Sequence, residues 1–181
     1  RDDVDKGCPL VLGGPMPHVI AAKAVAFEEA NTVEFTEYSN RIVENARALS
    51  SACIAEGMSI LTGGTDNHLM LADISTYGLT GRQAESSMRD ANITLNRNSI
   101  PFDSNGAWYT SGLRYGTPAL TSRGMGTGEM SEIASIMASV LSVTKPVEIT
   151  KGKQRGQLSK ARYANNTSTI ELAQNRVKEL L

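Results

Sequence analysis

The chain has 181 residues, of which 40% are hydrophobic, and its formal net charge is −1. This length suffices for one ordinary hydrophobic core with appendages. Near-neutral charge argues against a nucleic-acid-binding protein, and no apolar run approaches the roughly 18 residues that a membrane span needs. Cys8 and Cys53 are too few for a disulfide framework and lack zinc-site spacing, so part of a soluble cytoplasmic enzyme is expected.

The first third of the chain predicts a loop followed by two helices. Residues 7–17 are rich in glycine and proline, and no regular structure is expected there. The apolar run from Pro17 to Phe27 predicts a helix. A second helix, ending at Gly57, is indicated by apolar residues three and four positions apart, which share one helical face. These residues are Phe35, Tyr38, Ile42, Ala46, Leu49 and Cys53.

The middle of the chain alternates between strand and helix. Short strands are expected over residues 58–61 and 68–74, on either side of the Gly63-Gly64 turn. Thr80 predicts the N-cap of a helix, and the inner face of that helix consists of Ala84, Met88 and Ala91. This is an α/β pattern, with too few strands for a complete cofactor-binding domain.

Further along, residues 93–95 alternate like a strand, and a polar loop is expected over residues 96–111. The next short strand carries Arg114. Apolar periodicity predicts an amphipathic helix over residues 129–143. The glycine-rich stretch at residues 124–128 lacks the lysine of a phosphate-binding loop, so it is interpreted as a loop before that helix.

Basic residues then dominate the segment from 145 to 162, where Glu148 is the one acid. They are Lys145, Lys151, Lys153, Arg155, Lys160 and Arg162. Such a segment is either a polyanion-binding patch or a solvated connector. Tyr163 is the one aromatic residue beside it, and the connector is therefore favoured.

Arg114 is the residue whose side-chain chemistry most clearly suits a ligand. Its planar guanidinium presents a fork of donors that matches a carboxylate bidentately. The alternative is a solvated arginine, or one that is paired with a surface acid. His18 and His68 lack metal-site spacing and are interpreted as structural, and no metal site is expected.

Three motifs place Arg114 in context: GGPMPHVIAAKA at residues 13–24, GGTDNHL at 63–69 and TSGLRYGTPA at 110–119. In order and spacing they resemble the C-terminal part of serine hydroxymethyltransferase, from near residue 4 to about residue 141. The resemblance implies the C-terminal small domain of a fold-type-I pyridoxal-phosphate enzyme. Residues 30–145 would form a small, mostly antiparallel sheet covered by helices, residues 1–29 a remnant of the large domain, and residues 146–181 a C-terminal extension ending in a helix.

The resemblance also implies an activity, the interconversion of serine and glycine by a cytoplasmic homodimer. Pyridoxal phosphate would be the cofactor and tetrahydrofolate the one-carbon carrier. Arg114 would bind the substrate carboxylate, Gly13 and Gly14 would meet the cofactor phosphate bound to the neighbouring subunit, and Asn98 would help to hold the pterin ring. From the residues alone, a plain turn is favoured for Gly13-Gly14 and a turn asparagine for Asn98.

Two departures from the family pattern qualify this implication. Cys8 stands where many bacterial members carry an aromatic ring near the folate, so that contact is not expected here. The threonine-rich Thr-His-Lys motif that contains the family's cofactor lysine does not occur in the sequence. The chain is therefore expected to be a fragment that is inactive alone and holds no catalytic residue.

Two other hypotheses stay open at this point. One is a free-standing, non-catalytic α/β module that binds a small anion or a partner protein. The other is a different pyridoxal-phosphate aldolase or transaminase, which would share the arginine but not the GGTDNH motif. A reading frame that continues upstream of Arg1 into a Thr-His-Lys motif would exclude the free-standing module.

Overall fold

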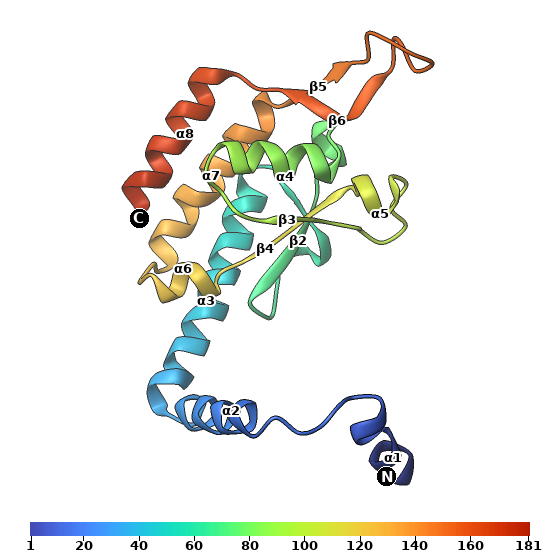
Figure 1. Ribbon diagram of the computed structural model, residues 1–181. Helices are drawn as coiled ribbons and strands as arrows, with labels where there is room; N and C mark the ends of the chain where they lie inside the picture. The colour runs from blue at the N-terminus through green and yellow to red at the C-terminus, as the bar shows by residue number, and fades with distance from the viewer. The chain divides into compact units, whose positions relative to one another are not determined.

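The computed structural model describes residues 1–181, except for the side chains of Cys8 and Pro9 (Figure 1). The expectation for Cys8 therefore lies outside the described part of the chain. Two compact units make up the chain, Arg1–Ser39 and Asn40–Leu181.

The unit Arg1–Ser39 contains α1 (Asp2–Leu10), α2 (Pro17–Ala30) and the beginning of α3 (Val33–Ala55). Acidic residues in the first turn of α1 interact favourably with its dipole, and the helix continues through Gly7. The expectation that residues 7–17 hold no regular structure is therefore wrong for residues 7–10. The helix predicted after Pro17 is confirmed as α2, and none of its residues is buried.

The unit Asn40–Leu181 is built on a four-stranded antiparallel sheet in the order β1-β2-β4-β3. The strands are β1 (Ser59–Ile60), β2 (Leu69–Asp73), β3 (Asn96–Asn98) and β4 (Gly112–Gly116). Met70, Ala72 and Leu113 point from one face of the sheet into the core. A small antiparallel sheet packed by helices was the predicted fold, and it is confirmed.

Helices α3, α4 (Gly81–Asp90) and α7 (Thr127–Val143) supply the rest of this core. Most of the predicted inward residues are buried, among them Leu49, Ala84 and Met137, whereas Phe35 is exposed. Gly57 adopts a left-handed conformation with φ of 81° just after α3, as its predicted role in ending that helix requires. The loop predicted over residues 124–128 is confirmed as far as Gly126, and α7 begins two residues earlier than expected, at Thr127. Glu129 accepts a hydrogen bond from the Gly126 amide at the start of the helix.

The strand expected over residues 93–95 lies three positions later, at β3, within the segment expected to be a polar loop. The Ile93 amide donates to the Met88 carbonyl, so this residue still belongs to the turn that ends α4. The same segment also contains the short helix α5 (Gly106–Tyr109). Both elements were missed because their residues are mostly polar and the pattern contains no apolar periodicity.

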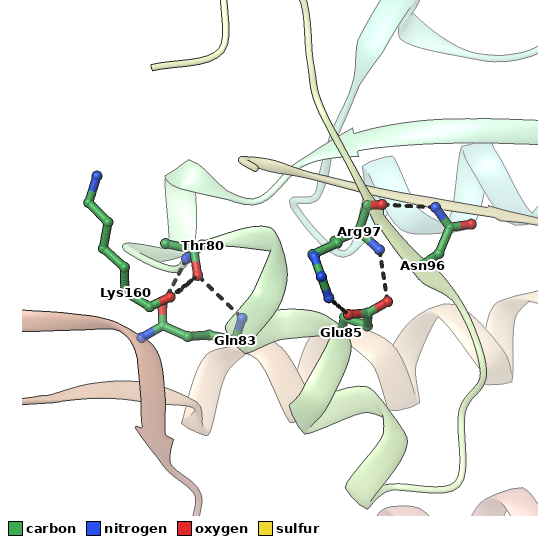
Figure 2. A network of polar contacts seen from close by, with 6 residues as sticks. All are labelled: Thr80, Gln83, Glu85, Asn96, Arg97 and Lys160. Atoms are coloured by element: carbon green, nitrogen blue, oxygen red, sulfur yellow. Dashed lines mark hydrogen bonds and ion pairs between the residues drawn. The ribbon is translucent and has the colours of Figure 1, made fainter. Parts of the chain in front are cut away.

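The predicted cap of α4 is confirmed. The Gln83 amide N–H donates to Thr80 Oγ1 at 3.3 Å, while the Thr80 amide donates to Gln83 Oε1 at 2.9 Å. The same two side chains also reach the C-terminal segment, because Thr80 Oγ1 donates to the Lys160 carbonyl at 2.8 Å (Figure 2). Gln83 Nε2 donates to the carbonyls of Ser159 and Arg162.

These bonds hold a hairpin of β5 (Lys145–Glu148) and β6 (Leu158–Ala164) against α4. Residues 145–162, interpreted as a solvated connector, thus form a hairpin and not an irregular segment, but their basic side chains are exposed in the strands as well as at the tip. The chain ends in α8 (Thr167–Leu180), which packs on α7 and is tied to it by the ion pair of Arg176 with Glu132. In the described part of the chain, no helix is both long and apolar enough to cross a membrane.

Candidate functional site

The four-stranded sheet has one face that the helices do not cover. In antiparallel strands, directly paired residues place their side chains on the same face. Arg114 pairs with Leu71 on one side and with Asn96 on the other. Since the neighbouring residue Leu113 is buried in the core, these three side chains lie on the opposite face. We call this surface the open face.

Arg114 is exposed at the centre of the open face. Its Nε donates to Asn96 Oδ1 at 3.2 Å, and no side chain that the structure describes pairs with its η nitrogens. The arginines Arg97 and Arg176, in contrast, are paired with Glu85 and Glu132. Within the described residues Arg114 is thus not paired with a surface acid, and its fork of donors is available to a ligand.

Asn98 shares this face with Arg114. It pairs with Gly112, two positions from the Asn96–Arg114 pair, and its Nδ2 donates to the Ser99 carbonyl at 2.7 Å. A Cβ at Gly112 would come within 2.6 Å of Ile100 Cγ2 and 2.8 Å of the Asn98 carbonyl. Glycine at this position therefore lets the chain around Asn98 approach the strand that carries Arg114.

A carboxylate holds the loop between Asn98 and Arg114 in place. Asp103 accepts hydrogen bonds from the amides of Ile100, Asn105 and Ser111 and from the Ser111 hydroxyl, the two shortest at 2.7 Å. Burial alone would raise the pKa of Asp103, but these hydrogen bonds outweigh it and lower the pKa below its usual value. These hydrogen bonds therefore favour the ionised form of Asp103.

Because the pKa of Asp103 is lower in the folded than in the unfolded state, it contributes stability above the unfolded pKa. That contribution is lost as the pH falls through the folded pKa. We expect Asp103→Asn to lower the free energy of unfolding at pH 7 by about 1–3 kcal/mol, since several charge-assisted bonds are weakened. Urea unfolding at pH 7 and at a pH below the usual aspartate pKa checks this, and the difference between wild type and variant should shrink at the lower pH. Asp66→Asn, at an exposed aspartate, is the matched control; equal effects of the two variants would contradict the prediction.

Gly13 and Gly14 belong to the other unit, Arg1–Ser39. Both are exposed, Gly13 has a φ of 77°, and the turn precedes α2. A Cβ at either position would meet no heavy atom within 4 Å. An exposed glycine turn before a helix is compatible with a phosphate ligand.

The other candidate groups have structural roles. Asn67 Oδ1 accepts from the Leu69 amide at 2.9 Å and so helps to order the turn of the GGTDNHL motif. The His68 carbonyl accepts from the Thr117 amide. Burial raises the pKa of the Cys53 thiol to about 11, which makes it a poor nucleophile at neutral pH. No cluster of metal-ligating side chains occurs among the residues that the structure describes.

Two cavities lie near the sheet, and Arg114 lines neither of them. One, of about 270 Å³, is apolar and lies between α7, α8 and the helix-facing side of the sheet. The other, of about 860 Å³, is bounded by the turn at residues 61–67 and by Leu69, Leu71 and Pro101. Since Leu71 pairs with Arg114 in the sheet, the second cavity borders the open face, where a ligand would have polar and apolar walls.

Asn96 is the residue of this site that the sequence did not reveal. The strand predicted over residues 93–95 ended before it, and Asn96 was assigned to a loop. With β3 in its observed register, the alternation of Asn96 and Asn98 places both side chains beside Arg114. Arg114 and Asn98 are thus brought together, and Gly13 and Gly14 are in a separate unit.

Fold and open face together define an α/β domain with an exposed arginine on its sheet. Comparison with known proteins is specific: the family model of serine hydroxymethyltransferase matches residues 5–137, and the chain belongs to this family. It is 62% identical over 149 residues to the serine hydroxymethyltransferase of Treponema pallidum, covering 82% of this chain and 26% of the relative.

Two further relatives match almost the whole chain. The serine hydroxymethyltransferases of Cutibacterium acnes and Salinispora tropica are 49% and 50% identical to it, each over 99% of this chain. The chain spans 36% and 37% of their lengths. Members of the family are fold-type-I enzymes that use pyridoxal phosphate and tetrahydrofolate and act on serine and glycine.

Proposed function

We propose that the full-length protein containing this chain interconverts serine and glycine and transfers the side-chain carbon of serine to tetrahydrofolate. The observation that supports this proposal most is the open guanidinium of Arg114 within the family's TSGLRYGTPA motif. Pyridoxal phosphate, when bound, withdraws electrons from the substrate's α-carbon, so that a bond to this carbon can break. The cofactor lysine and the general base are proposed to lie outside this chain.

In this proposal Arg114 binds the carboxylate of the amino acid and thereby orients the α-carbon. Orientation matters because only the bond held perpendicular to the cofactor ring is weakened, and a carboxylate gripped at two points fixes which bond that is. Asn98, on the same face, offers an amide that can donate to and accept from the pterin of tetrahydrofolate. The location of both groups on one face is consistent with an amino acid and a folate that must meet.

The roles proposed for the remaining parts rest on the family resemblance. Residues 1–29 belong to the large cofactor-binding domain, residues 30–145 form the small domain, and residues 146–181 extend it. The protein is a cytoplasmic homodimer, in which Gly13 and Gly14 of one subunit meet the cofactor phosphate bound to the other.

The direct test incubates the purified full-length protein with serine and tetrahydrofolate and measures glycine. Glycine should form, and omission of either tetrahydrofolate or pyridoxal phosphate should abolish or strongly reduce its formation. A protein that binds these ligands but forms no glycine, even with serine, tetrahydrofolate and pyridoxal phosphate all present, would contradict the proposal. That result would favour the non-catalytic binding module.

The glycine turn gives a separate prediction. In the full-length protein, Gly13→Ala should weaken retention of pyridoxal phosphate by about three- to tenfold, because a side chain at this left-handed position strains the backbone that presents the donor. Equilibrium dialysis against decreasing cofactor concentrations measures this affinity, and thermal unfolding of the cofactor-free protein monitors folding. Gly7→Ala, within α1 and without positive φ, is the control. Unchanged cofactor affinity would make Gly13-Gly14 a plain turn.

A further inference from the structure

Asn96 occupies a specific edge of the Arg114 guanidinium. The two residues are direct partners across β3 and β4, and Asn96 Oδ1 accepts the hydrogen bond from Arg114 Nε. A guanidinium can grip a carboxylate in two ways, through Nε together with one η nitrogen or through both η nitrogens. Since Asn96 uses Nε, the edge formed by the two η nitrogens is the one that remains for a ligand.

The orientation of the Asn96 amide is itself fixed. Its Nδ2 donates to the Arg97 carbonyl at 2.9 Å (Figure 2). This bond leaves the amide oxygen to accept from Arg114. Arg97 is anchored in turn from the other side of the sheet, where its amide donates to Glu85 Oε1 at 3.3 Å and its side chain forms an ion pair with the same carboxylate. A continuous set of contacts therefore runs from α4 through β3 to the Arg114 guanidinium.

We infer that Asn96 is a positioning residue that aligns Arg114 to receive the substrate carboxylate end-on, through its two η nitrogens. This inference rests on the proposed function of Arg114. The physical reason is rotational freedom: an arginine side chain alone on an exposed sheet surface samples many orientations, and a hydrogen bond at Nε limits them before the ligand arrives. Asn96 itself does not touch the substrate.

The test is a double-mutant cycle in the full-length holoenzyme, with the dissociation constant of glycine measured by calorimetry. Arg114→Lys should weaken glycine binding by at least about tenfold, and Asn96→Ala by about three- to tenfold. In the double variant, Asn96→Ala should cause almost no further loss of glycine affinity, because lysine has no Nε edge to align. With serine, the Asn96→Ala variant should show a larger change in KM than in kcat.

Controls separate positioning from folding. Thermal unfolding should change little in Asn96→Ala, and Asn96→Leu, which keeps the volume but removes the acceptor, repeats the test if alanine disturbs β3. Asn40→Ala, at an exposed asparagine of α3, should leave glycine affinity unchanged.

Each other outcome has a definite meaning. If Arg114→Lys weakens binding and Asn96→Ala does not, the inference is overturned while the role of Arg114 stands. Additive losses in the double variant would also overturn it, because Asn96 would then act independently of Arg114. If Arg114→Lys leaves glycine affinity intact, the proposed substrate role of Arg114 fails, and the inference fails with it.

Discussion

Arg114→Lys should lower the catalytic efficiency of the full-length enzyme with serine by at least about tenfold, and Arg114→Ala should lower it considerably more. Lysine keeps the charge but loses the bidentate fork, whereas alanine loses both. A charge-assisted hydrogen bond contributes on the order of 1.5–3 kcal/mol, and this sets the size of the effect. Steady-state kinetics over a range of serine concentrations measures it.

The controls for Arg114 use both the substrate and the protein. With a substrate analogue that lacks the carboxylate, either change should leave the catalytic efficiency nearly unaltered, because the proposed contact is not formed. Arg89→Lys, at an exposed arginine at the end of α4, should have no effect on kinetics. Folded Arg114 variants that keep wild-type efficiency with serine would reduce Arg114 to a structural cation.

The largest expected effect on stability is at Gly116, the last residue of β4. A Cβ there would lie 2.3 Å from the His68 carbonyl oxygen and 3.2 Å from Leu69 Cα. Both are backbone atoms of the neighbouring chain segment, so they cannot rotate away as a side chain would. We expect Gly116→Ala to lower the free energy of unfolding by about 1–3 kcal/mol or more, as measured by denaturant titration.

Gly128→Ala is the matched control for this change. Gly128 lies in the first turn of α7, and a Cβ there meets no heavy atom within 4 Å. Alanine is a better helix former than glycine, so this variant should be neutral or more stable by up to about 1 kcal/mol. Equal destabilisation by the two substitutions would show that the close approach at Gly116 is not the cause.

Elements with their own periodic signal were predicted from the sequence. Helices α3, α4 and α7 follow from apolar spacing and local caps such as Thr80 with Gln83. Elements whose stability comes from distant partners were missed. The β5–β6 hairpin is held on α4 by Gln83, whose acceptors at Ser159 and Arg162 are 76 and 79 positions away in the sequence. No local pattern contains that information.

The candidate site shows the same division. Arg114 and Asn98 could be chosen from the sequence because of their chemistry and their place in family motifs. Their common face could not, since it depends on the register between β3 and β4, and a shift of one residue would point Asn98 into the core. Asn96 became visible as a member of the site only when that register was known.

The most direct measurement is a crystal structure of the full-length enzyme with glycine bound. The two carboxylate oxygens should each lie about 2.7–2.9 Å from an η nitrogen of Arg114, as charge-assisted hydrogen bonds do, and Nε should keep its bond to Asn96. A carboxylate bound elsewhere, or an Arg114 that forms an ion pair with an acid of the protein in place of the ligand, would contradict the assignment of the open face as the substrate site.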